Sequence, residues 1–145
     1  MLCFPLEQPM PVAVRDFPWF AALLALIGGL GLAAAWVAVA MISWHQSAWM
    51  ALLAALDAAF LLRLGGAKPG LLRMALGVAA TLLAIALANW GIVAAHMAGM
   101  MGMGFSDAAL KLGPSLAWTL STLANAPTDL AWLLAGIVLA AVASR

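Results

Sequence analysis

The chain has 145 residues, of which 68% are hydrophobic and only 8% are charged, and its mean hydropathy is +1.14. A soluble domain is typically about 25% charged and about 45–50% apolar, so this composition predicts an integral membrane protein. The formal net charge of +1 is too small for a nucleic-acid-binding surface. The single cysteine, Cys3, excludes an internal disulfide and a cysteine-based zinc or iron–sulfur centre.

Residues 1–17 are predicted to form an extended cytoplasmic tail, because they contain three prolines and lack the apolar core of a signal peptide. The first predicted span, residues 18–43, carries no charged residue. A helix needs roughly 20 apolar residues to cross about 30 Å of hydrocarbon. This span is longer than a signal-peptide core, so we expect it to remain as an uncleaved anchor.

Three further spans are predicted, at residues 47–64, 71–97 and 128–144. The short turn 65–70 between the second and the third predicts an antiparallel helical hairpin. The fourth span is the shortest of the four and follows Pro127, with Thr128 as its expected N-cap and Asp129 at the helix start. Residues 18–145 are therefore expected to form an all-α integral membrane domain, a four-transmembrane-helix bundle.

The segment 105–125, between the third and fourth predicted spans, has a different pattern. Lys111 and Gly113 interrupt it, and the apolar piece from Pro114 to Asn125 has 12 residues, about 18 Å as a helix. This length is too short to cross a bilayer. The pattern predicts an interfacial or re-entrant helical segment.

The basic residues beside the spans predict the orientation. With four spans, both termini and the turn 65–70 share one side of the membrane. That side carries five basic residues, whereas the other carries only Lys111: the five are Arg15, Arg63, Lys68, Arg73 and Arg145. Basic residues concentrate on the cytoplasmic side, so both termini are expected in the cytoplasm. The high content of alanine and leucine suggests a bacterial inner membrane.

Two polar residues, Asp57 and Asn89, lie inside the predicted apolar spans, where a polar side chain is costly unless it has a partner or a function. Asp57 is expected about 10 Å deep, where an acid costs about 2.5–3.5 kcal/mol. It can pair with Arg63 or Arg73, it can be a protonated acid bonded to another helix, or it can be a proton or cation transport site. The structural interpretations are favoured because no second intramembrane charge supports transport. Asn89 lies two turns before His96, and we expect it to join helices by hydrogen bonding rather than to line a pathway.

The segment HMAGMMGMG, residues 96–104, contains candidate metal ligands. If the helix continues, His96, Met100 and Met103 share one face, and His45 lies at a similar depth; these four residues are the His/Met cluster. Imidazole and thioether ligands suit Cu(I), and two histidines can alternatively hold a haem. Methionine is also ordinary packing material, and three glycines are expected to loosen this helix end. Packing is therefore the expected role, and no stoichiometric cofactor is expected.

The function must be inferred from these features together. No motif pairs a nucleophile with a base, so we expect no enzymatic activity. Small residues such as Ala25, Gly29 and Ala33 permit close helix packing, either within the bundle or against a partner. We expect a non-catalytic subunit or accessory component of a membrane protein complex, surrounded by lipid and contacting other subunits or a second copy. The alternative is a small transporter or copper-handling membrane protein that uses Asp57 and the His/Met cluster.

Overall fold

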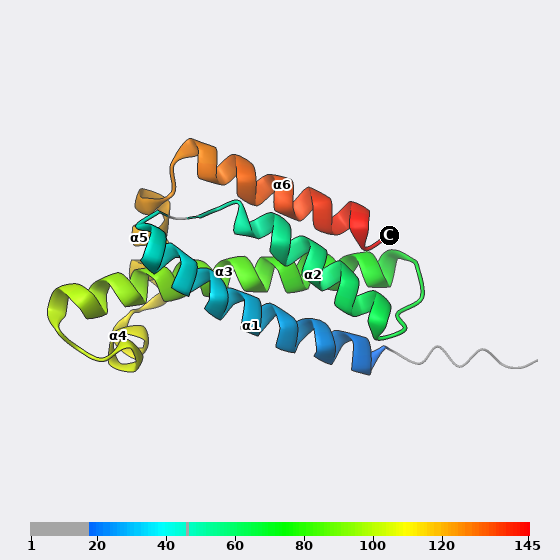
Figure 1. Cartoon of the computed structure of the whole chain (residues 1–145), viewed down its shortest axis with the longest axis horizontal. Coiled ribbons are helices and arrows are strands. Elements are labelled where there is room, and N and C mark those ends of the chain that lie inside the picture. Colours follow the sequence, from blue (N-terminus) through cyan, green and yellow to red (C-terminus); the bar gives the residue numbers. More distant parts are fainter. Residues whose placement is uncertain (1–17, 46) are drawn as a thin grey trace, which may run out of the picture.

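The computed structural model describes residues 18–45 and 47–145, which form six helices and the turns between them, with no strand among these residues (Figure 1). The helices are α1 (Trp19–Ser43), α2 (Met50–Leu64), α3 (Leu71–Met101), α4 (Phe105–Lys111), α5 (Pro114–Ala124) and α6 (Pro127–Ala143). The predicted all-α class is confirmed. The predicted tail, residues 1–17, lies outside the described part of the chain.

The prediction of four membrane spans is not supported by helix length. Among the described residues, only α1, with 25 residues, and α3, with 31, are each long and apolar enough to cross a membrane. Helices α5 and α6 meet the same criterion only as a pair, and they are bent by 109° at the break between them. Helix α2 has 15 residues and α6 has 17, which give about 22 Å and 26 Å at about 1.5 Å per residue. The fold therefore fits a helical membrane protein with two or three candidate spans.

Backbone conformation explains where two helices differ from the predicted segments. The second segment was expected to begin at residue 47, but α2 begins at Met50 because Trp44 and Ser47 adopt left-handed conformations, with φ of 57° and 48°. Helix α3 extends beyond residue 97 to Met101. It ends where Gly102 takes a φ of 63° and its N–H donates to the carbonyl of Ala98. Glycine adopts this conformation without steric cost, which makes it a common helix terminator.

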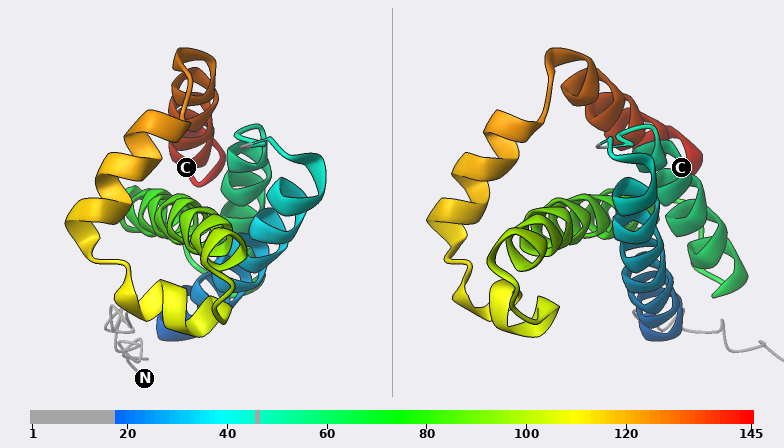
Figure 2. Two further views of the ribbon diagram at one scale, coloured as in Figure 1. Left: turned by 90° about the vertical axis from the view of Figure 1, so that its left-hand side faces the viewer. Right: turned by 60° about the vertical axis from the view of Figure 1, so that its left-hand side comes forward.

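Helix α3 is the centre of the arrangement, because it contacts each of the other five helices described. Helices α1, α2, α3 and α6 run side by side along the long axis of the molecule (Figure 1), whereas α4 and α5 contact α3 alone. Figure 2 shows α5 crossing one end of the molecule and standing apart from α1 and α2. Mostly small residues fill the core, and Trp36, 1% exposed, is its largest fully buried side chain.

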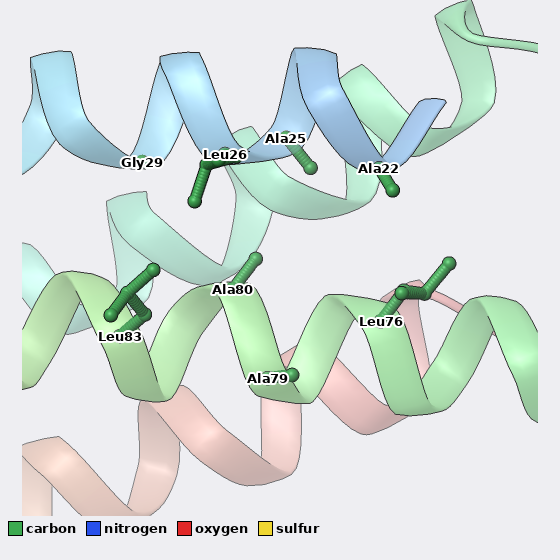
Figure 3. Close-up of a pocket in the computed structure, with 8 residues that line it drawn as sticks. All are labelled: Ala22, Ala25, Leu26, Gly29, Leu76, Ala79, Ala80 and Leu83. Atoms are coloured by element: carbon green, nitrogen blue, oxygen red, sulfur yellow. The ribbon is translucent and has the colours of Figure 1, made fainter. Parts of the chain in front are cut away.

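The interface between α1 and α3 illustrates how small residues permit this packing. Four residues of α1 face four of α3 across it (Figure 3): Ala22, Ala25, Leu26 and Gly29 face Leu76, Ala79, Ala80 and Leu83. They line an open apolar groove of about 170 Å³. A Cβ atom added at Gly29 would lie 3.8 Å from the carbonyl oxygen of Ala80, an ordinary van der Waals distance, so α1 and α3 are in contact here. The small residues on this face of α1 are therefore used for packing within the chain.

The two ends of the helix arrangement differ in charge. The start of α1, the α2–α3 turn and the C-terminal end of α6 lie at one end (Figure 1), which we call the basic end. It carries four cationic residues and no acidic residue among those described: Arg63, Lys68, Arg73 and Arg145. The opposite end carries Asp107, Lys111 and Asp129 on α4 and α6. The positive charge of the described residues is thus concentrated at the basic end.

Arg73 joins three segments at the basic end. Its side chain is only 8% exposed, and its Nε donates to the carbonyl oxygen of Ser144 at 2.8 Å. Nη1 donates to the carbonyl of Ala67 at 3.3 Å, and Nη2 donates to the carbonyl of Arg145. A buried guanidinium needs several acceptors, and the last carbonyls of a helix lack partners within it. Arg73 and the C-terminal end of α6 therefore satisfy each other.

Candidate functional site

A cavity of about 920 Å³ opens at the end opposite the basic end, and we call it the end cavity. The α1–α2 turn, α3, the end of α5 and the start of α6 form its wall, and Figure 2 (left) looks onto this end. The wall contains His45 and His96, Met97 and Met100, and the carboxylate of Asp129. Three of the four residues of the predicted His/Met cluster therefore lie around one cavity.

Both imidazole rings in the wall are oriented by a backbone carbonyl. The Nδ1 atom of His96 lies 2.9 Å from the carbonyl oxygen of Ile92, one turn earlier in α3. The Nδ1 atom of His45 lies 2.7 Å from the carbonyl oxygen of Ser43. A carbonyl oxygen can only accept, so each Nδ1 carries the hydrogen and each Nε2 of the neutral ring keeps its lone pair. The two histidines are therefore held in the tautomer that can bind a ligand through Nε2.

The methionines of the segment lie in three different environments. Met97 is partly buried and packs on the cluster that contains Val93, Leu112 and Ala117. Met100 is 80% exposed although it lies in the cavity wall. Met103 follows the end of α3, so it does not continue the helical face of His96 and Met100, and it is not in the cavity wall.

Met97 was not among the predicted site residues. Met97 and Met100 are three residues apart and so lie about 60° apart around the helix axis, which places Met97 at the border of the face defined by His96 and Met100. The end cavity extends far enough around α3 to include it. The three-residue spacing of Met97 and Met100 is the sequence signal that could have found it, whereas the extent of the cavity depends on where α5 and α6 pack.

Three tryptophans and one helix-capping carboxylate also line the end cavity. Trp44, Trp49 and Trp132 line it with 84%, 49% and 47% of their surface exposed. Tryptophans in such positions are typical of a membrane–water interface. The Oδ2 atom of Asp129 accepts a hydrogen bond of 2.9 Å from the backbone N–H of Ala126, so this carboxylate caps α6. Within the described residues, no group of three His, Cys, Asp or Glu side chains is placed to bind a metal.

Asp57 does not lie in the wall of the end cavity. It is partly buried on α2, and its Oδ2 atom would be 3.0 Å from a Cβ atom added at Gly28, so it faces α1. The predicted pairing with an arginine is not formed, because neither Arg63 nor Arg73 has Asp57 among the hydrogen-bond partners found in the described residues. Arg63 instead donates to the carbonyl of Ala143 at 2.8 Å, and Arg73 binds the carbonyls described above.

Asn89 joins two helices by a hydrogen bond. Its Oδ1 accepts from Nδ2 of Asn125 at 3.0 Å, which ties the middle of α3 to the residue after α5. Its own Nδ2 donates to the carbonyl of Ile85, also at 3.0 Å. Asn89 lines an apolar cavity of about 470 Å³ between α3, α5 and α6, whereas His96 lines the end cavity. The two residues therefore belong to different sites, although the sequence placed them on one face.

No protein-family model matches the chain, and neither a curated protein nor a solved structure is similar to it.

Proposed function

We propose that the chain is a four-pass protein of a bacterial inner membrane, with the basic end in the cytoplasm, that serves as a non-catalytic accessory subunit of a membrane protein complex. The charge distribution supports this orientation, because four cationic residues lie at the basic end and basic residues concentrate on the cytoplasmic side. On this proposal α1, α2, α3 and α6 cross the bilayer, and α4 and α5 lie at the outer interface.

Helices α2 and α6 are short, but α2 can cross the bilayer together with the turn that precedes it, and α6 can cross a locally thinned bilayer. Residues 47–49 precede α2 in a tight turn, in which Met50, Ala51 and Leu52 donate to carbonyls three residues earlier. Ala48 and Trp49, at about 2 Å each, add about 4 Å to the 22 Å of α2 and bring it to about 26 Å, close to the thickness of the hydrocarbon core. Helix α6 is about 26 Å long, and a bilayer thins locally around a span of that length.

The observation that carries the proposed role is a second small-residue face on α1. The small residues that α1 buries within the chain are Ala21, Ala25, Ala33 and Ala40. On the opposite side of the helix, four exposed small residues form what we call the outer α1 face: Gly31, Ala34, Ala35 and Ala38. A Cβ atom added at Gly31 would have no neighbour within 4 Å. Small residues are enriched where membrane helices meet, so this face suits a transmembrane helix of a partner subunit.

The test is a pair of substitutions on the outer α1 face. The double variant Ala34→Leu, Ala38→Leu is expected to reduce co-purification of the partner subunit at least tenfold, because the larger side chains keep the partner helix at a distance. The matched control is Ala131→Leu, Ala135→Leu, the same changes at the same spacing on the exposed side of α6.

The measurement uses the full chain at native expression, extracted from its own membranes in a mild detergent. The partner is identified by mass spectrometry and confirmed by tagging that partner in return. Loss of the partner in the α1 variant alone supports the proposal. A parent chain that runs as a free monomer, or an α1 variant that keeps its partner, contradicts it.

A further inference from the structure

Four side chains in the wall of the end cavity carry neutral nitrogen or sulfur atoms that can bind a soft metal ion. His45 and His96 each have Nδ1 bound to a backbone carbonyl, which leaves Nε2 available. Histidines that bind metals are almost always oriented in this way, by a carbonyl or carboxylate on the other ring nitrogen. Met97 and Met100 add two thioether sulfur atoms in the same wall.

One of the two reasons to expect packing alone, the loosened helix end, does not hold in the structure. That expectation assumed a loosened helix end after residue 96. Helix α3 instead continues regularly to Met101 and is terminated by Gly102, so His96, Met97 and Met100 all lie on ordered helix. Met100, at 80% exposed, does not fill a gap in the protein. A sulfur atom that is held on an ordered helix and left unpacked is free to bind a ligand.

We propose that the end cavity binds one Cu(I) ion through Nε2 of His45 and His96 and the sulfur atoms of Met97 and Met100. This proposal is independent of the role as an accessory subunit. Neutral imidazole and thioether ligands favour a soft monovalent ion, whereas hard divalent ions favour oxygen ligands. The four ligands carry no charge, so Cu(I) leaves a single positive charge near the membrane, and the carboxylate of Asp129 lies in the same wall. A haem held by the two histidines would leave both methionines without a role.

The experiment titrates the purified full chain in detergent, under anaerobic conditions, with Cu(I) as the metal alone, in competition with a chromogenic Cu(I) chelator. We expect one Cu(I) per chain. The double variant His45→Ala, His96→Ala is expected to bind at least 100-fold more weakly, and Met97→Leu, Met100→Leu at least tenfold more weakly. Methionine and leucine have similar volumes, so the second variant keeps the fold.

The matched control is Met101→Leu, Met103→Leu, which makes the same chemical change at two nearby methionines outside the cavity wall. Its affinity is expected to stay within twofold of the parent. X-ray absorption at the copper edge gives a second readout: nitrogen and sulfur scatterers in the parent, and no sulfur in Met97→Leu, Met100→Leu. A parent that binds no Cu(I), or a control that loses as much affinity as the cavity variant, overturns the site. Binding that requires the histidines but not the methionines, with equal affinity for Zn(II), overturns the assignment to Cu(I).

Discussion

Replacing Arg73 by leucine is expected to lower the free energy of unfolding by about 3 kcal/mol. The guanidinium is buried and donates to the carbonyls of Ala67, Ser144 and Arg145, so its removal leaves three acceptors at the basic end without this partner. A hydrogen bond from a charged donor contributes about 1.5–3 kcal/mol, and a buried group left unpaired costs about 1–3 kcal/mol. The end of α6 should therefore separate from α3.

The control for Arg73 is Arg63→Leu. Arg63 is exposed and makes one hydrogen bond, to the carbonyl of Ala143, so we expect a loss of about 1 kcal/mol or less. Both variants are measured by reversible unfolding in mixed detergent micelles, with hydrogen exchange of α6 as a local readout. Equal losses for Arg63→Leu and Arg73→Leu would contradict the joining role of Arg73.

Adding one methyl group at Gly136 is expected to destabilise the fold by about 2–3 kcal/mol. Gly136 is buried in α6 against α2, and its added Cβ would lie 2.8 Å from the carbonyl oxygen of Ala51 and 2.9 Å from its Cβ. Neither atom belongs to a flexible side chain, so Gly136→Ala forces α2 and α6 apart. Overpacking of a close interface typically costs about 1–3 kcal/mol.

The same glycine-to-alanine substitution at Gly31 is not expected to lower the stability of the fold. Gly31 lies on the outer α1 face with open space around it, and alanine is about 1 kcal/mol better than glycine inside a helix. Gly31→Ala should therefore leave the monomer unchanged or slightly more stable in the same unfolding assay. If Gly136→Ala is as stable as Gly31→Ala, α2 and α6 do not pack as described.

Local patterns predicted much of the fold. The long apolar runs predicted helices over residues 18–43 and 71–97, because hydrophobicity and length are properties of single segments. The start of α2 was missed because it depends on the left-handed conformations of Trp44 and Ser47, which non-glycine residues rarely adopt. The length of α3 was underestimated because the helix ends only where Gly102 caps it.

Residues of the candidate site could be predicted to lie close together only where they belong to the same end of the predicted spans. His45 and His96 were placed together because both belong to the same end of adjacent spans, and both line the end cavity. The contacts of Asn89 with Asn125 and of Arg73 with the end of α6 were missed. Each joins residues that are distant in sequence, and their meeting depends on the bend of 109° between α5 and α6 and on the packing of α6.

The central claim is that α2 and α6, short as they are, cross the membrane together with α1 and α3. Single cysteines at Ser47, Lys68, Lys111 and Arg145, in a Cys3→Ser background, can be labelled in intact bacterial cells with a maleimide that does not cross membranes. We predict labelling from outside at Ser47 and Lys111, and labelling at Lys68 and Arg145 only after permeabilisation. Labelling of Ser47 and Lys68 from the same side would mean that α2 does not cross. The same result for Lys111 and Arg145 would mean that α6 does not cross.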